Sequence, residues 1–289
     1  MIGQTLLGRY TVESLVAEGG MGIVYRARDR HGGTVGIKRM RGDVEASAEL
    51  LARFQREASV QAMLMHPNIA TLHAVGATDD GGLFFVMELV EGEGLAEALK
   101  SGPLAPRRAI SIAVQVLSAL HYAHQMGLVH RDLKVDNILL AQSSGGGAEQ
   151  AKVIDFGLVK LLGETFSELD QGLTADGALF GTPQYMAPEH IIGAPIDART
   201  DLYAMGVLLF IMLTGQPPYD YPQVTDTWRA HLTAPVPSIA EVNPAADDPD
   251  LDAIVTTLLA KNPDERFDSA RAARRALESV RLDPHEPQP

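Results

Sequence analysis

The chain has 289 residues and a formal net charge of −13, with 37 acidic against 24 basic residues and no cysteine. This length suffices for one large domain or two lobes with a sizeable core, and the acidic balance disfavours nucleic-acid binding, which needs a basic face. Without cysteine the chain can form neither a disulfide nor a cysteine metal site, which fits a cytosolic protein.

Strands are predicted over most of the first third of the chain. Alternating apolar and polar residues favour strands at residues 9–16, 23–27, 34–38 and 83–88, with glycine-containing turns between the early ones. Residues 46–65 are good helix formers with an apolar stripe. Pro67 ends this predicted helix, because proline disfavours helical backbone in the residue before it.

Helices dominate the remainder, at residues 107–125, 200–213, 251–259 and 269–280, while short strands at 138–141 and 151–154 flank a flexible loop at 143–147. The apolar stretch at 205–213 is far shorter than the roughly 20 residues of a membrane span, so it predicts a buried helix. The N-terminus lacks the apolar run of a signal peptide, and the proline-rich tail, residues 281–289, is predicted to be disordered. The whole pattern predicts an α+β protein of two lobes.

The strongest chemical signal is the segment 130–137 together with the Asp-Phe-Gly that begins at Asp155. Phosphoryl transfer needs positioning, charge neutralisation and a carboxylate near the attacking hydroxyl. Asp132 can supply the carboxylate, Lys134 a cation for the transferred phosphate, and Asn137 an oxygen for Mg²⁺. Asp155 follows an apolar strand, where its carboxylate can ligate Mg²⁺ that bridges the phosphates of ATP.

These two segments resemble the catalytic loop and the metal-binding loop of the eukaryotic-like (Hanks-type) protein kinases, and the chain most resembles their bacterial serine/threonine branch. The resemblance covers residues 9–282. It implies a bilobal kinase domain over residues 10–280, with a small β-rich N-lobe (10–90) that holds one main helix and a larger α-helical C-lobe (91–280). It also implies ATP-dependent phosphorylation of serine or threonine hydroxyls on protein substrates, with Mg²⁺, or Mn²⁺ in its place, as the metal.

The resemblance implies a set of ATP contacts. Lys38 would pair with the α- and β-phosphates and act with Asp132 and Lys134 in catalysis, and Met87 would be the gatekeeper beside the adenine. Glycines near the start of the chain would let backbone amides approach the phosphates closely. The implied ATP-binding residues are Val16, Ala17, Glu18, Gly19, Gly20, Met21, Gly22, Ile23, Val24, Lys38, Met87, Glu88, Val90, Asn137 and Asp155, of which Asn137 and Asp155 would hold the metal.

Four residues are implied to have regulatory roles. Glu57 matches the helix glutamate that pairs with the strand lysine, and Arg131 resembles the arginine that binds a phosphate on the activation segment. Thr174 is the predicted phosphorylation site of that segment, and Thr182 looks like the residue that hydrogen-bonds the catalytic aspartate and lysine. Autophosphorylation of the segment would switch the enzyme on.

Other matches are structural. Glu189 and Arg266 resemble the buried ion pair that anchors the large lobe, and Asp201 resembles the aspartate at a helix start that holds the catalytic loop, although an aspartate there is also an ordinary N-cap. His121 and His124 are interpreted as helix-face residues rather than metal ligands, because no acidic third ligand accompanies them.

Two alternative functions are compatible with parts of the sequence. A small-molecule phosphotransferase of kinase-like fold is disfavoured by Lys134 and by the Ala-Pro-Glu at residues 187–189. A pseudokinase that acts as a scaffold is suggested by three departures from the family pattern, namely Ala17 for glycine, Gly36 for alanine and Val135 for proline. None of these departures removes a side chain that would contact phosphate or metal.

The resemblance also bears on partners and location. Related bacterial domains often dimerise through the small lobe, so a homodimer is one expectation, and protein substrates with serine or threonine are the other partners expected. The chain would be either a whole short kinase or the kinase part of a longer receptor. The expected location is the cytoplasm, or the cytoplasmic side of a membrane receptor.

Overall fold

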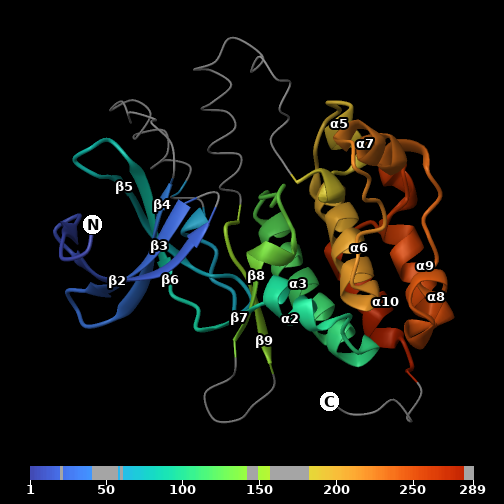
Figure 1. Ribbon diagram of the computed structural model, residues 1–289, viewed down its shortest axis with the longest axis horizontal. Coiled ribbons are helices and arrows are strands. Elements are labelled where there is room, and N and C mark those ends of the chain that lie inside the picture. The colour runs from blue at the N-terminus through green and yellow to red at the C-terminus, as the bar shows by residue number, and fades with distance from the viewer. Residues whose placement is uncertain (20–21, 41–57, 59–60, 142–148, 157–181, 283–289) are drawn as a thin grey trace. The chain divides into compact units, whose positions relative to one another are not determined.

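The computed structural model describes residues 1–19, 22–40, 58, 61–141, 149–156 and 182–282 (Figure 1). They fall into two compact units, of which the first ends at Glu91 and the second begins at Gly92, and each is considered by itself. Several predicted features lie outside the described residues: Gly20, Met21, Glu57, Gly157, Thr174, most of the helix at 46–65, the loop at 143–147 and the tail from residue 283.

The described residues of the first unit form a six-stranded antiparallel sheet in the order β1-β2-β3-β4-β6-β5. The strands are β1 (Thr5–Leu6), β2 (Tyr10–Gly19), β3 (Gly22–Asp29), β4 (Thr34–Met40), β5 (Leu72–Ala77) and β6 (Leu83–Glu88). The four predicted strands correspond to β2, β3, β4 and β6. Strand β2 runs beyond the predicted end at residue 16, because its ladder with β3 continues through the glycines to the pair Gly19 and Gly22.

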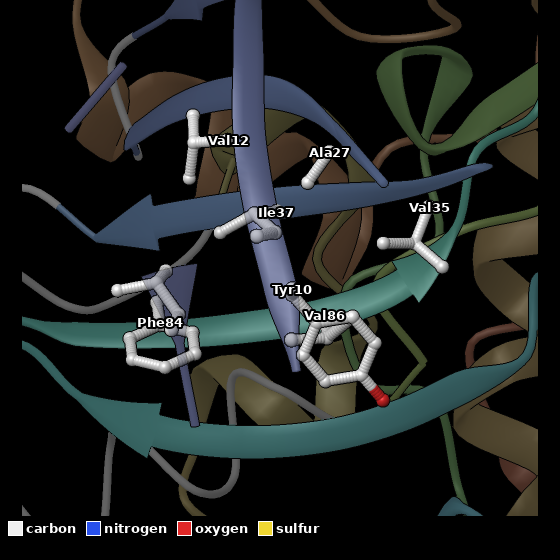
Figure 2. Close-up of a cluster of buried hydrophobic side chains, with 8 residues drawn as sticks. Tyr10, Val12, Ala27, Val35, Ile37, Phe84 and Val86 are labelled. Carbon is white, nitrogen blue, oxygen red and sulfur yellow. The ribbon is translucent and has the colours of Figure 1, made fainter. Parts of the chain in front are cut away.

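One face of this sheet carries a hydrophobic core (Figure 2). Successive side chains of a strand point to opposite faces, so alternate residues of neighbouring strands meet there. The buried members are Leu6, Tyr10, Val12, Ala27, Val35, Ile37, Phe84 and Val86. Full burial of each large apolar side chain contributes about 1.5–3 kcal/mol. The residues that alternate with these along the strands, such as Lys38 in β4 and Phe85 in β6, point to the other face.

An ion pair joins the start of β2 to the end of β3. The Nη2 of Arg9 lies 2.6 Å from the Oδ2 of Asp29, and the backbone N–H of His31 donates to the Oδ1 of the same carboxylate at 3.0 Å. The Arg9 hydrogen bond, followed by the His31 amide, lowers the pKa of Asp29 to about 2. The arginine side chain is 45% exposed, so solvent screens this pair.

The second unit combines a small sheet with helices. The sheet has the order β7-β8-β9, from β7 (Gly92–Gly94), β8 (Ile138–Ala141) and β9 (Gln150–Val153). The α-helices of the described residues are α2 (Leu95–Ala98), α3 (Pro106–Gln125), α5 (Pro188–Ile191), α6 (Ala198–Thr214), α7 (Val224–Thr233), α8 (Ile239–Val242), α9 (Pro249–Leu258) and α10 (Ala270–Ser279). The 3₁₀ turns are η1 (Leu99–Ser101), η2 (Val135–Asn137), η3 (Pro183–Tyr185), η4 (Pro244–Ala246) and η5 (Pro263–Glu265).

Helix α6 is the core of the second unit. Its residues from Thr200 to Leu213 are all buried, which confirms the predicted buried helix. It packs against α3 and α9, and α3 also packs against α10, as Figure 1 shows. Gly206 permits the contact with α9, because a Cβ at this position would lie 2.8 Å from the Cβ of Leu258. Across the described part of the chain, no helix is both long enough and apolar enough to cross a membrane.

Candidate functional site

A buried carboxylate anchors the loop of residues 130–137. Asp201, in the first turn of α6, accepts hydrogen bonds from the backbone N–H groups of His130 at 2.8 Å and Arg131 at 2.9 Å. The Nε2 of His124 lies 2.7 Å from the same carboxylate. Burial acts to raise the pKa of Asp201, but the interactions with His124 and His130 together hold the pKa below its usual value.

This geometry confirms that Asp201 holds the loop backbone. It also gives His124 a role that its sequence position did not reveal. Its side chain is 9% exposed and reaches Asp201 from α3, across a separation of many residues. The anchor therefore ties the loop to both α3 and α6, the two longest described helices of the unit.

His130 joins the loop to the strand that precedes Asp155. Its Nδ1 accepts the backbone N–H of Asp132 at 3.3 Å, so its Nε2 is the nitrogen that donates to the carbonyl oxygen of Ile154, also at 3.3 Å. The ring packs edge-on against Phe156, with centroids 4.6 Å apart. The two predicted catalytic segments are thus fixed to each other by one fully buried side chain.

Two residues of this region have left-handed backbone conformations. The φ angle is +68° at Arg131 and +57° at Asp155. Non-glycine residues in this conformation cost on the order of 1–3 kcal/mol each and persist only where their surroundings enforce them. Both lie beside residues held by the bonds just described, and both were predicted from the sequence to be functional.

Asp132, Lys134 and Asn137 form one cluster. The Nζ of Lys134 lies 2.9 Å from the Oδ2 of Asp132. The Nδ2 of Asn137 donates to the backbone oxygen of Asp132 at 2.7 Å and to its Oδ2 at 3.2 Å. Because both partners engage Oδ2, the Oδ1 of Asp132 is the carboxylate oxygen open to a further proton or donor. The amide oxygen of Asn137 is likewise the atom left to face a cation.

Asn137 and Asp155 are brought together by a backbone bond. The N–H of Ile154, the residue before Asp155, donates to the backbone oxygen of Asn137 at 2.9 Å. This bond places the backbone of Asp155 next to a residue tied to Asn137. A carboxamide oxygen and a carboxylate are both ligands for hard divalent cations. Mg²⁺ is commonly bound through one or two carboxylates together with waters and substrate phosphates, so these donors fit such an ion.

The turn that begins at Thr182 lies against the same cluster. The Nζ of Lys134 donates to the Oγ1 of Thr182 at 3.4 Å, which gives the lysine half of the predicted interaction. The Nε2 of Gln184, in η3, donates to the Oδ1 of Asp220 at 3.2 Å. A cavity of about 20 Å³ lies between the turn and the loop, lined among others by Arg131, Asp132 and Thr182.

Behind this turn lies a buried histidine. His231 of α7 is fully buried, and its Nδ1 lies 2.8 Å from the hydroxyl of Tyr203 in α6. Tyr219 packs edge-on against its ring, and the Nζ of Lys261 donates to the Tyr219 hydroxyl at 2.9 Å. Burial lowers the pKa of His231 to about 4, and the ammonium of Lys261 acts in the same direction.

The predicted pair of Glu189 and Arg266 is confirmed. The Nη1 and Nη2 of Arg266 donate to the two carboxylate oxygens of Glu189 at 2.8 and 2.7 Å, and Thr200 donates to the same carboxylate at 2.8 Å. Both charged residues are buried. Burial acts to raise the pKa of Glu189, but the hydrogen bond and charge of Arg266 hold it below its usual value.

In the first unit, strand register places predicted ATP-binding residues on one face. Ala17 pairs with Val24, Val24 pairs with Lys38, and Gly36 pairs with Met87. Directly opposed residues of antiparallel strands share a face. Lys38 and Gly36 alternate with the core residues Val35 and Ile37, so this face is opposite the core of Figure 2.

The two described glycines of the glycine-rich segment have different surroundings. A Cβ on Gly22 would lie 2.3 Å from the backbone oxygen of Arg39, whereas a Cβ on Gly19 would have no atom within 4 Å. The ladder of β3 and β4 therefore requires glycine at position 22. At position 19 the local packing imposes no such requirement.

The predicted adenine contacts lie at the end of β6. The backbone N–H of Glu88 donates to the oxygen of Thr71 at 2.8 Å, and its Oε2 accepts the backbone N–H of Thr71 at 3.3 Å. Val90, the next predicted contact, is partly exposed. A Cβ on Gly36 would lie 3.6 Å from side-chain atoms of Met87 and Leu89, which is an ordinary packing distance.

Comparison with known proteins adds independent findings. The family described as protein kinase domain matches residues 10–278. The serine/threonine-protein kinase pkn3 of Myxococcus xanthus is 38% identical over 284 residues, which cover 96% of this chain and 51% of that protein. PknB of Mycolicibacterium smegmatis is 38% identical over 284 residues, covering 95% and 43%. The chain thus spans about half the length of the curated relatives it matches.

A solved structure is also similar. The crystal structure of the Mycobacterium tuberculosis PknI kinase domain superimposes with a TM-score of 0.74 at 29% sequence identity. The match covers 96% of this chain and 98% of the PknI chain.

Proposed function

The chain belongs to the protein kinase domain family and has its fold, and on this premise we propose that it transfers the γ-phosphoryl group of ATP to serine or threonine hydroxyls of proteins. The cluster of Asp132, Lys134 and Asn137 is the observation that carries the proposal. We assign the catalytic domain to residues 10–280, with lobes 10–90 and 91–280, supported by the family match over residues 10–278.

Asp132 acts as the base in this proposal. Lys134 and Asn137 both bind its Oδ2, so Oδ1 is the atom that orients the substrate hydroxyl and accepts its proton. The same two partners fix the carboxylate plane, which positions the reacting group before the substrate arrives. Serine and threonine hydroxyls therefore meet a preorganised acceptor.

Lys134 neutralises charge that develops on the transferred phosphoryl group. Its ammonium is held by Asp132 and Thr182 and is nearly buried, so its charge is weakly screened by solvent. Asn137 and Asp155 hold the divalent metal, which we propose to be Mg²⁺, with Mn²⁺ as a substitute. When bound, that ion neutralises and orients the phosphates of ATP.

The first unit supplies further proposed contacts with ATP. Lys38 contacts the phosphates, residues 16–24 cover them, and Met87, Glu88 and Val90 meet the adenine. The shared face of Ala17, Val24, Lys38 and Met87 supports this assignment.

Regulation is proposed to act through the activation segment. Arg131 binds a phosphate on Thr174, and Glu57 pairs with Lys38. The backbone of Arg131 is held by Asp201 beside the catalytic cluster, which supports a link from that phosphate to Asp132. Mass spectrometry after incubation with ATP and Mg²⁺ tests this part. An active enzyme without phosphate on Thr174 would refute it.

Partners and location are proposed from the family. The protein substrate is the first partner, a homodimer is the second, and a cytoplasmic location, alone or as part of a longer membrane receptor, is supported by the absence of cysteine. Size-exclusion chromatography with light scattering tests the homodimer. A monomeric mass across a wide concentration range would count against it.

A phosphotransfer assay with matched variants tests the central proposal. Asp132→Asn removes the base without changing side-chain shape, and we expect its kcat to fall about 10²–10⁴-fold. Asp136→Asn makes the same chemical change at an exposed position of the same loop and should retain activity. Equal phosphate incorporation by Asp132→Asn and the wild type would end the base assignment, and a wild type that incorporates none would favour the pseudokinase scaffold.

A further inference from the structure

Val135 makes a hydrogen bond that proline, the usual residue of the family pattern at this position, could not make. Its backbone N–H donates to the hydroxyl of Tyr185 at 3.4 Å. Proline has no N–H. The departure from the family pattern therefore adds a bond between the catalytic loop and the turn η3.

The backbone at this position would accept either residue. Val135 opens the turn η2, where the first N–H groups have no partner within the turn. Lys134 before it is extended, with φ −157° and ψ 170°, as a residue before proline must be. Proline is also favourable at a first helical position. The bond to Tyr185, and not the shape of the loop, is what distinguishes valine from proline here.

The partner hydroxyl is well suited to accept this bond. Burial raises the pKa of Tyr185 above the usual value for tyrosine, so the hydroxyl keeps its proton. A neutral hydroxyl accepts one hydrogen bond and still has its own proton to donate. Loss of the Val135 bond would leave a mostly buried phenol without its partner in the loop.

Two consecutive residues of the loop bind two residues of the same turn. Lys134 bonds to Thr182 and Val135 bonds to Tyr185. The cavity of about 20 Å³ that separates the loop from the turn is large enough for about one water, so packing between them is incomplete. The two hydrogen bonds therefore do much to fix the position of the turn relative to the loop.

We propose that Val135 is a positioning residue for the protein substrate, acting through its backbone N–H and Tyr185. This rests on the proposed kinase function. A substrate hydroxyl that meets the Oδ1 of Asp132 must belong to a chain that passes beside the turn, because Lys134 joins that turn to the carboxylate. The bond from Val135 holds the turn in the place where it can contact that chain.

Kinetics of three variants test the proposal. Val135→Pro and Tyr185→Phe each delete the bond, while Val135→Ala shortens the side chain and keeps the N–H. We expect the first two to raise KM for the protein substrate about threefold to tenfold, the range set by one hydrogen bond, and to leave KM for ATP unchanged. Val135→Ala should match the wild type, and the variant with both Val135→Pro and Tyr185→Phe should be no worse than either alone.

Two results would overturn the proposal: Val135→Pro behaving like Val135→Ala, or the effects of Val135→Pro and Tyr185→Phe multiplying in the combined variant. The first would show that the N–H is irrelevant to substrate binding. The second would show that the two residues act separately.

Amide hydrogen exchange gives a readout that does not depend on activity. In Tyr185→Phe the amide of Val135 should exchange about threefold to tenfold faster than in the wild type, while the amide of Ile154, which bonds to Asn137, should be unchanged. An unchanged Val135 rate would refute the bond itself. If the wild type transfers no phosphate but the exchange result holds, the kinase proposal fails and the contact between loop and turn stands.

Discussion

The two units place their functional residues by different means. In the first, strand register aligns Ala17, Val24, Lys38 and Met87 on one face, and the backbone supplies much of the expected contact surface. In the second, each chemical group is held by buried side chains, as Asp201 holds the loop. The first unit should therefore respond most to changes of backbone space, and the second to loss of a charged or polar partner.

Loss of the Arg266 guanidinium should give the largest effect. Arg266→Met leaves the carboxylate of Glu189 buried without its bidentate partner, and removing one member of a buried pair costs about 3–5 kcal/mol. Urea unfolding followed by the fluorescence of Trp228, the single tryptophan, in α7 of the second unit, measures this.

The matched control is Arg9→Met in the first unit, whose arginine is 45% exposed in its pair with Asp29. It should shift the unfolding midpoint measured by circular dichroism far less, because solvent screens that pair. Equal shifts for the two variants would remove the distinction between the units.

A methyl group on Gly22 should disturb the first unit. Gly22→Ala forces a Cβ against the backbone oxygen of Arg39, and overpacking of this kind costs about 1–3 kcal/mol. Gly19→Ala meets open space and should leave stability nearly unchanged. Thermal unfolding compares the stabilities of the two variants, and titration with an ATP analogue compares their affinities for nucleotide. Equal tolerance at both positions would contradict the observed close approach of β3 and β4.

Acid should weaken the second unit through His231. Its pKa is lowered from 6.5 to about 4 in the folded chain, so between those values the unfolded chain binds more protons and stability falls as pH falls. From pH 7 to pH 5 the loss amounts to about 2 kcal/mol. Tyr203, Tyr219 and Lys261 face the ring.

Urea unfolding at pH 7 and pH 5 measures this loss. His231→Gln should have a correspondingly shallower pH dependence, whatever its absolute stability. Burial also lowers the pKa of His190, and that contribution is common to both proteins. An unchanged slope in His231→Gln would show that another group governs the acid response.

The smallest expected effect is a gain in the first unit. Gly36→Ala places a methyl at 3.6 Å from Met87 and Leu89, an ordinary contact, and removes the flexibility of glycine inside a strand. It should stabilise the chain by about 0.5–1 kcal/mol and slightly tighten binding of an ATP analogue. Calorimetry measures both, and a destabilised variant would show that the space beside Met87 is more restricted than the backbone suggests.

Sequence patterns predicted the elements whose side chains alternate or form a long apolar face, such as β4, β6, α3 and α6. They did not predict β1, β5 and β7. Strand β1 has only two residues, the register of β5 is shifted between Leu72 and Ala74, and the short, glycine-containing β7 is defined by pairing with the distant β8. Helix α7 was also missed, since its buried residues are few and include the polar His231.

In the candidate site, too, some features were predictable from the sequence and others were not. Family order located Asp132, Lys134, Asn137 and Asp155. The described bonds join the first three, and the bond from Ile154 to Asn137 fixes the backbone beside the fourth. The role of His124 was not predicted, because its partner is far away in the sequence. The absence of proline at position 135 indicated that a backbone N–H is available there. The identity of its acceptor, Tyr185, depends on how the turn folds.

The anchoring of the loop by Asp201 has a consequence for genetics. The loop takes its position from α6, the most deeply buried helix described, so any substitution that displaces this helix also displaces Asp132. In a screen for loss of function, apolar positions such as Leu208 and Met212 should be recovered alongside the catalytic aspartate. Second substitutions elsewhere in the core that restore the position of α6 should rescue the variants at Leu208 and Met212. They should not rescue variants of Asp132.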